Sequence, residues 1–174
     1  AAERLFAVAE HIGDWETAFD TLEKLKVIQS EYLVSYQCKE AWIWSRRLGQ
    51  YERAIEIYDK ILEEHYLNLD VFVQLIGVLQ TVHDIEGIKK RFVLMMERCK
   101  KDSAIDDNAR LAYEIGLGKI SLLNLGSVPA AIRVYRAASA LAPDNINLHQ
   151  ILWVLYEAEG EIDKVLEEMH EVFF

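Results

Sequence analysis

The chain has 174 residues, of which 52% are hydrophobic and 28% are charged, so it has enough apolar side chains for a packed core and is not expected to be disordered. Its formal net charge of −10 disfavours nucleic acid and anionic membrane surfaces as partners, because binding to either depends on lysine and arginine. Two prolines and eight glycines are too few for a fold of many short strands, and the composition favours long helices.

The sequence also sets expectations about the surroundings of the chain. No run of eighteen apolar residues occurs, and the first residues lack the basic and apolar regions of a signal peptide, so we expect neither membrane insertion nor export. Cys38 and Cys99 belong to no CxxC pair and are predicted to be reduced thiols of a cytoplasmic protein, with a disulfide as the less expected alternative. Both ends lie inside helical patterns, and we interpret the chain as a fragment of a longer protein.

One short theme recurs five times along the chain and begins at a turn residue. In chain order the turn residues are Gly13, Gly49, His83, Gly126 and Gly160. Each is followed two positions later by an aromatic or branched residue, and five positions later by a residue that is small in three of the five segments. The turns are 36, 34, 43 and 34 residues apart, which predicts repeated units of about 34 residues.

The segment after each turn carries apolar residues at i, i+4 and i+7, the spacing of one face of an amphipathic helix. In chain order these sets are Ala18, Leu22 and Leu25; Ala54, Tyr58 and Ile61; Ile88, Phe92 and Met95; Ala131, Tyr135 and Ala138; and Val165, Met169 and Val172. Each turn is therefore predicted to lead into a helix that buries this face.

Residues that begin and end helices agree with this reading. The four turn glycines suit the left-handed conformation in which many helices end. Asp84 and Ser127 are placed to cap the next helix, and Pro129 falls in a first helical turn, where no backbone donor is needed. Pro143 follows a predicted helix, and Asn145 stands shortly after it, where it can cap the next one.

These features resemble the tetratricopeptide repeat family over essentially the whole chain. Segment Leu48–Leu62 matches the family pattern best, and Pro143 stands where the family carries a proline. The resemblance implies an all-α fold, a right-handed α-solenoid of about five tetratricopeptide-like helix-turn-helix repeats in one domain, 1–174. The expected repeats are 1–33, 34–67, 68–102, 107–143 and 144–174. We place the extra residues of the 43-residue interval near 100–107, as a longer loop or as longer flanking helices.

Three other helical architectures fit parts of the pattern. An irregular helical bundle would need five turns in register by accident. A solenoid of HAT-like or other degenerate repeats is a closer competitor. Pentatricopeptide RNA-binding proteins have a similar period, but the acidic balance of this chain disfavours them.

The family resemblance implies that the first helix of each pair lines a concave groove that binds a partner segment. The groove positions expected from the family pattern are Tyr36, Lys39, Ile43, Arg46, Arg47, Val73, Gln80, Tyr113, Ile120, Asn147, Gln150 and Val154. Lys39, Arg46 and Arg47 form a basic spot in an otherwise mainly apolar groove. The alternative is that the two arginines only stabilise the C-terminal end of a helix.

Chaperone-binding members of the family hold a carboxylate with paired Lys and Asn side chains. The corresponding positions here are Glu3 and Ala7 in the first repeat and Lys39 and Ile43 in the second, so a chaperone carboxylate clamp is not expected.

Three tryptophans lie on predicted first helices, where they either pack the core or anchor a partner. Trp42 and Trp153 occupy positions where the family prefers a small residue, and core packing is the favoured reading. Trp44 is the better candidate for an anchor, because Trp42 and Trp44 cannot share one helix face.

No motif of catalysis, nucleotide binding or zinc binding occurs, so we expect no enzyme, no cofactor and no metal site. Acidic residues near His65 and His170 indicate solvated helix faces, and His11, His83 and His149 are interpreted as structural. We expect a protein-interaction scaffold or assembly subunit that binds another protein or peptide segment. The alternative is a regulatory domain that senses a small peptide or ligand. Phe173 and Phe174 indicate further repeats or self-association through the C-terminal end.

Overall fold

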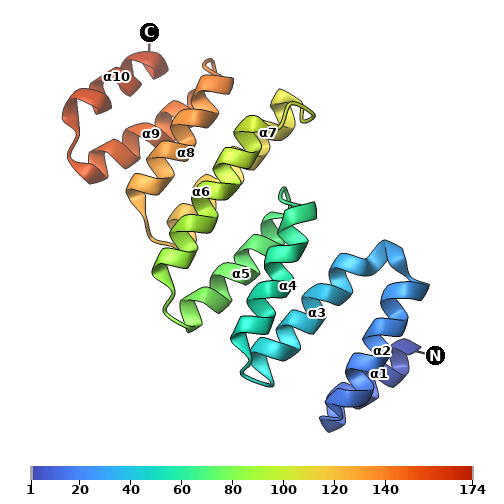
Figure 1. The fold of residues 1–174 in the computed structure, drawn as a ribbon. Coiled ribbons are helices and arrows are strands. Elements are labelled where there is room, and N and C mark those ends of the chain that lie inside the picture. Colours follow the sequence, from blue (N-terminus) through green and yellow to red (C-terminus); the bar gives the residue numbers. More distant parts are fainter. Residues whose placement is uncertain (1, 174) are drawn as a thin grey trace. The chain divides into compact units, whose positions relative to one another are not determined.

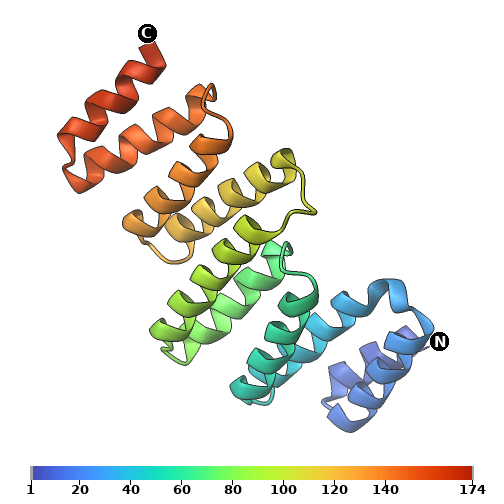
Figure 2. The ribbon, with the colours of Figure 1, turned by 45° about the horizontal axis from the view of Figure 1, so that its top comes forward.

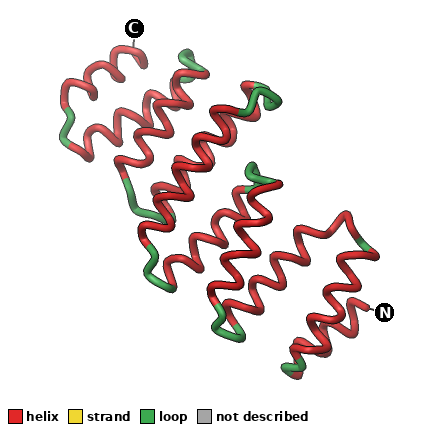
Figure 3. Tube along the Cα trace, viewed as in Figure 1, coloured by secondary structure: helices red, strands yellow, loops and turns green. Residues whose placement is uncertain are grey.

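The computed structural model describes residues 2–173, and these residues form helices and no strand, so the all-α prediction is confirmed (Figures 1 and 3). The α-helices are α1 (Ala2–Ile12), α2 (Trp15–Ile28), α3 (Leu33–Arg46), α4 (Tyr51–Glu64), α5 (Leu69–Thr81), α6 (Ile85–Lys101), α7 (Asp107–Leu123), α8 (Val128–Leu141), α9 (Ile146–Glu159) and α10 (Ile162–Phe173). A short 3-10 helix, η1 (Ser30–Tyr32), precedes α3. Over this described part, no helix is both long and apolar enough to cross a bilayer.

The chain forms two compact units, Ala1–Ile85 and Glu86–Phe174. In the first unit each helix from α1 to α5 packs against the next one along the chain, and in the second unit α7, α8, α9 and α10 do the same. Successive packed helices run antiparallel and are joined by short connections (Figure 2). The single domain and the five repeat boundaries expected from the sequence stay predictions, and the two helices of the expected third repeat, α5 and α6, belong to different units.

All five predicted turn residues adopt the left-handed conformation. The backbone φ angles of the four glycines lie between 60 and 78°. His83 has φ 59°, the value that glycine reaches without steric cost. The turn prediction is therefore confirmed, including the position where histidine replaces glycine.

Side-chain caps fix where several helices begin. The Ser127 hydroxyl accepts from the backbone N–H of Ala130, and Pro129 lies in the first turn of α8, as predicted. Asn145 caps α9, also as predicted. The Asp106 carboxylate accepts from Ala109 at 2.8 Å and starts α7, a cap that the sequence analysis did not single out. These side chains satisfy backbone donors that have no partner inside the helix.

The predicted apolar stripes contribute to the core of both units, although Met169 and Val172 of the last stripe are only half-buried. The small or branched residue that opens each stripe is buried in all five cases: Ala18, Ala54, Ile88, Ala131 and Val165. In the second unit, Tyr135 packs with residues of α9 and α10 in one cluster. A Cβ atom added at Gly118 would lie 2.6 Å from the Tyr135 ring, so the missing side chain is what lets α7 and α8 approach there.

The nine residues beyond the period lengthen two helices and do not form a long loop. Helices α6 and α7 each have 17 residues, whereas the other α-helices have 11 to 14. The connection between them, 102–106, is short. Of the two expected alternatives, a longer loop or longer flanking helices, the structure has the longer helices.

Candidate functional site: a pocket between α1 and α3

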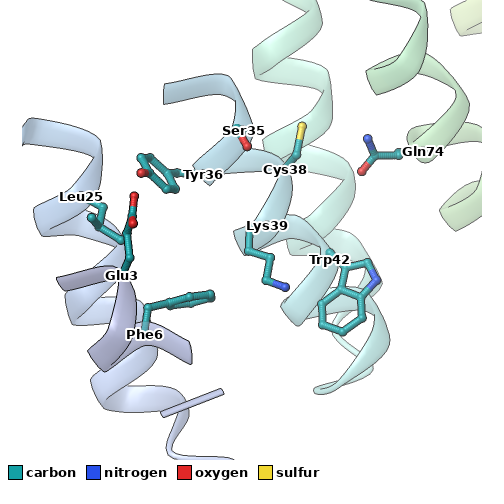
Figure 4. Close-up of a pocket in the computed structure, with 9 residues that line it drawn as sticks. All are labelled: Glu3, Phe6, Leu25, Ser35, Tyr36, Cys38, Lys39, Trp42 and Gln74. Carbon is teal, nitrogen blue, oxygen red and sulfur yellow. The ribbon is translucent and has the colours of Figure 1, made fainter. Parts of the chain in front are cut away.

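A cavity of about 460 Å³ opens between α1 and α3 in the first unit (Figure 4). The side chains around it come from four helices: Glu3 and Phe6 from α1, Leu25 from α2, Ser35, Tyr36, Cys38, Lys39 and Trp42 from α3, and Gln74 from α5. Several of these side chains face the same cavity because residues three or four positions apart lie on one face of a helix. Lys39 and Trp42 are so spaced on α3, and Glu3 and Phe6 on α1.

Lys39 is held inside this pocket by a carboxylate and two aromatic rings. Its Nζ lies 2.8 Å from Glu10 Oε1, 4.8 Å from the centre of the Trp42 ring and 5.7 Å from the centre of the Phe6 ring. The ion pair neutralises the ammonium, and the ring faces add a cation–π attraction. Lys39 therefore contributes a paired charge to the pocket and not a free one.

The three residues of the expected basic spot do not act as one group. The Arg47 guanidinium lies 5.0 Å from the centre of the Trp42 ring and lines a separate cavity of about 440 Å³ with Glu10, His11 and Trp15. Arg46 is exposed and does not line the first pocket. Because Lys39 is paired with Glu10, the basic spot divides into a neutralised lysine and two arginines outside the pocket.

The opposite side of the pocket is acidic. Glu3 is exposed there, and no cation pairs with its carboxylate among the ion pairs of the described residues. The Tyr36 hydroxyl donates to Gln29 Oε1, and burial and the nearby Glu3 charge raise the pKa of Tyr36. Burial also raises the pKa of the Cys38 thiol, so the pocket does not activate this cysteine as a nucleophile.

The two tryptophans of α3 have different surroundings in the structure. Trp44 stacks on Phe19 with ring centres 4.5 Å apart, and the Arg53 guanidinium lies 4.4 Å from its ring centre. Trp44 therefore packs helices together, whereas Trp42 lines the pocket. That Trp44 is the better anchor stays a prediction, and the pocket favours Trp42 instead, because the packing of the other helices decides which face of α3 is open.

The predicted groove residues of the first unit differ in how deeply their side chains are buried. Tyr36 and Lys39 line the pocket, and Val73 is half-buried on α5, while Gln80 is exposed at the end of that helix. Ile43 has no exposed surface and packs the core, so it is unavailable to a partner.

In the second unit, Tyr113 and Ile120 on α7 are buried and are unavailable to a partner in the same way. Asn147, Gln150 and Val154 are exposed on α9.

Most of the other residues that surround the pocket are not predicted from the sequence as site residues. From the sequence, Glu3 is expected only at a clamp position and Cys38 only as a reduced thiol, and Phe6 and Gln74 are not among the expected site residues. The spacing of Phe6 three residues after Glu3 is a usable signal once α1 is known to face α3. Gln74 accepts from the buried Tyr58 hydroxyl at 3.1 Å, which fixes its amide beside the pocket.

A second polar arrangement connects α9 to α10 in the second unit. His149 Nδ1 lies 2.7 Å from Glu168 Oε2, and His149 Nε2 lies 2.7 Å from the Pro143 carbonyl oxygen. The structural role expected for His149 fits these contacts. Glu168 belongs to the acidic stretch that was read as a solvated face, and its side chain is only 16% exposed. Nowhere in residues 2–173 do three or more His, Cys, Asp or Glu side chains gather as a metal site would require.

The C-terminal helix also exposes an apolar stripe. Ile162, Leu166 and Phe173 are each at least 60% exposed, and the Phe173 ring meets the edge of Trp153 with ring centres 6.2 Å apart. Self-association through this face stays a prediction, and Phe174 lies outside the described residues.

Comparisons with solved structures identify similar folds. The chain is similar to the Podosopora anserina putative kinesin light chain with nearly identical TPR-like repeats, with a TM-score of 0.50 and 18% identity over 98% of this chain and 91% of that chain. Matches of lower TM-score include MamA from Desulfovibrio magneticus RS-1 (0.40, 17% identity, 98% and 90% covered) and MamA AMB-1 (0.42, 20% identity, 98% and 94% covered). No protein-family model and no curated protein matches the chain.

Proposed function

Because this chain has the fold of tetratricopeptide-like helical repeats, we propose that it is a protein-interaction scaffold that holds a segment of a partner protein between α1 and α3. The observation that carries the proposal is the pocket itself, which is open, lined mainly by apolar atoms and bordered by Phe6, Tyr36 and Trp42. Aromatic side chains supply a large contact area at small entropic cost and are enriched where binding energy concentrates.

The proposed surface extends beyond the pocket to exposed or half-exposed residues of the other first helices. Val73 and Gln80 extend it along α5 in the first unit, and Asn147, Gln150 and Val154 form a separate contact area on α9 in the second. The three buried residues of the sequence prediction are left out.

A chaperone carboxylate clamp is not part of the proposal. Such a clamp needs a free cation for the ligand's carboxylate, whereas Lys39 is already paired with Glu10. Glu3, at the other clamp position, would repel a carboxylate. No reaction is assigned to the pocket, because the described residues that line it include no histidine and its cysteine is not activated.

Site-specific photocrosslinking tests the proposal. Benzoylphenylalanine placed at Phe6 points into the pocket, and the same group at Val27, which is 82% exposed on α2, is the matched control. We expect a crosslinked protein with the Phe6 probe in cell extract, and Trp42→Ala in the same chain should abolish this product. Equal products from both probes, or a product unaffected by Trp42→Ala in a folded chain, would refute the pocket as the binding site.

A further inference from the structure

The charge of the pocket follows from which of its ionisable side chains are already paired. Among the described residues that line it, Lys39 is the one cation, and Glu10 neutralises it at 2.8 Å. The Glu3 carboxylate then leaves the pocket with a net negative charge. The surrounding unit reinforces this sign, because residues 1–85 carry fifteen acidic and eight basic side chains.

The walls of the pocket are also complementary to a cation, as the position of the Lys39 ammonium indicates. Its ammonium lies over the Phe6 and Trp42 rings, whose faces carry the negative end of the ring quadrupole. The Lys39 side chain is 38% exposed, so the space around its ammonium is open to water and to an entering group. Arg47, which also lies over Trp42, lines the second cavity and leaves the first one open.

We propose that the pocket between α1 and α3 takes a basic side chain of the partner segment, arginine in preference to lysine. The apolar stem of the arginine packs between Phe6 and Trp42, and its guanidinium reaches the Glu3 carboxylate. Arginine suits the site better than lysine, because its planar group stacks on aromatic rings and forms two parallel hydrogen bonds to a carboxylate. This inference rests on the proposed function and specifies the chemistry of the partner.

An acidic side chain fits the same site poorly. To pair with Lys39 it would have to displace Glu10, which is held at 2.8 Å, and it would meet the like charge of Glu3 across the pocket. Both effects oppose an acidic anchor, although the basic spot expected from Lys39, Arg46 and Arg47 would attract one.

Titration with small probes tests the choice of charge on the full chain. The probes are N-acetylarginine methylamide, its uncharged citrulline isostere and N-acetylglutamate methylamide, each followed by the indole N–H signal of Trp42 in nuclear magnetic resonance spectra. We expect the arginine probe to bind about two- to fivefold more tightly than the citrulline probe, the range of a partly exposed ion pair. Trp44, which stacks on Phe19, is the internal reference and should not shift.

Two matched variants assign the effect to the pocket. Glu3→Gln should remove the preference for arginine over citrulline, whereas Glu16→Gln, the same change at an exposed position of α2, should preserve it. Stronger binding of the glutamate probe, a preference that survives Glu3→Gln, or the absence of any shift at Trp42 would overturn the inference. If crosslinking from Phe6 still depends on Trp42 in that case, the proposed function stands and only the cationic anchor is wrong.

Discussion

The contact between His149 and Glu168 predicts that α10 is held in place by a protonated histidine. The two ring nitrogens of His149 both face oxygen acceptors at 2.7 Å, so only the doubly protonated ring is able to donate to both. Burial by itself would lower the pKa of His149, but hydrogen bonds to Glu168 and the Pro143 carbonyl and the charges of Glu168 and Glu171 raise it above 6.5 overall. Glu168 and Glu171 are the charged groups that act on the ring.

The sign of the pH dependence follows from this raised pKa. The contact contributes fully below the ordinary pKa of the histidine ring, and its contribution is lost as the pH rises through the pKa of the folded state. Val165 is the one buried side chain among the described residues of α10, so the helix depends strongly on such polar contacts. We therefore expect α10 to open more readily at pH 9 than at pH 6.

Glu168→Gln tests this contact with little change of shape. The substitution replaces a charge-assisted hydrogen bond by a neutral one, which costs about 1 kcal/mol. The side chains of His149 and Glu168 are 10% and 16% exposed, so screening by water reduces this free energy only slightly. A change of about 1 kcal/mol raises the fraction of open α10 about fivefold.

Hydrogen exchange of the α10 amides, corrected for the intrinsic dependence of exchange on pH, measures this opening. Glu167→Gln, at an exposed position of the same helix, is the control for the loss of one negative charge. We expect faster exchange and a flatter pH dependence for the Glu168 variant alone. Equal effects of the two variants, or protection of α10 that increases with pH in the unmodified chain, would refute the reasoning.

Three further predictions concern backbone and cysteine positions. Gly118→Ala should destabilise the second unit by about 1–3 kcal/mol, because the added methyl group meets the Tyr135 ring. Gly77→Ala should stabilise α5 by up to about 1 kcal/mol, because its methyl group would meet nothing within 4 Å beyond the neighbouring backbone of its own helix, and chemical denaturation compares the two variants. His83→Gly should raise the melting temperature, since replacing a side chain at φ 59° relieves about 1 kcal/mol of strain, and a lower one would contradict this. Iodoacetamide should modify half-buried Cys38 before Cys99, because burial raises the pKa of the Cys99 thiol to about 11. Equal rates of modification would refute that order.

The sequence was sufficient to predict the features that depend on spacing along one stretch of chain. A turn followed by apolar residues at i, i+4 and i+7 fixes where a helix begins and which of its faces is buried, because each follows from the helical period. For the same reason the left-handed conformation of His83 was predictable: the residue occupies the register of a turn glycine.

The pocket depended on tertiary packing, because its residues come from helices separated along the chain. Lys39 is paired with Glu10, 29 positions earlier, and this contact reversed the charge expected for the site. The family pattern predicted that Ile43 lies in the groove, but its side chain is buried under the helices that pack on α3. The periodicity of a helix determines which residues share a face, whereas the packing of neighbouring helices decides whether that face lines a pocket or the core.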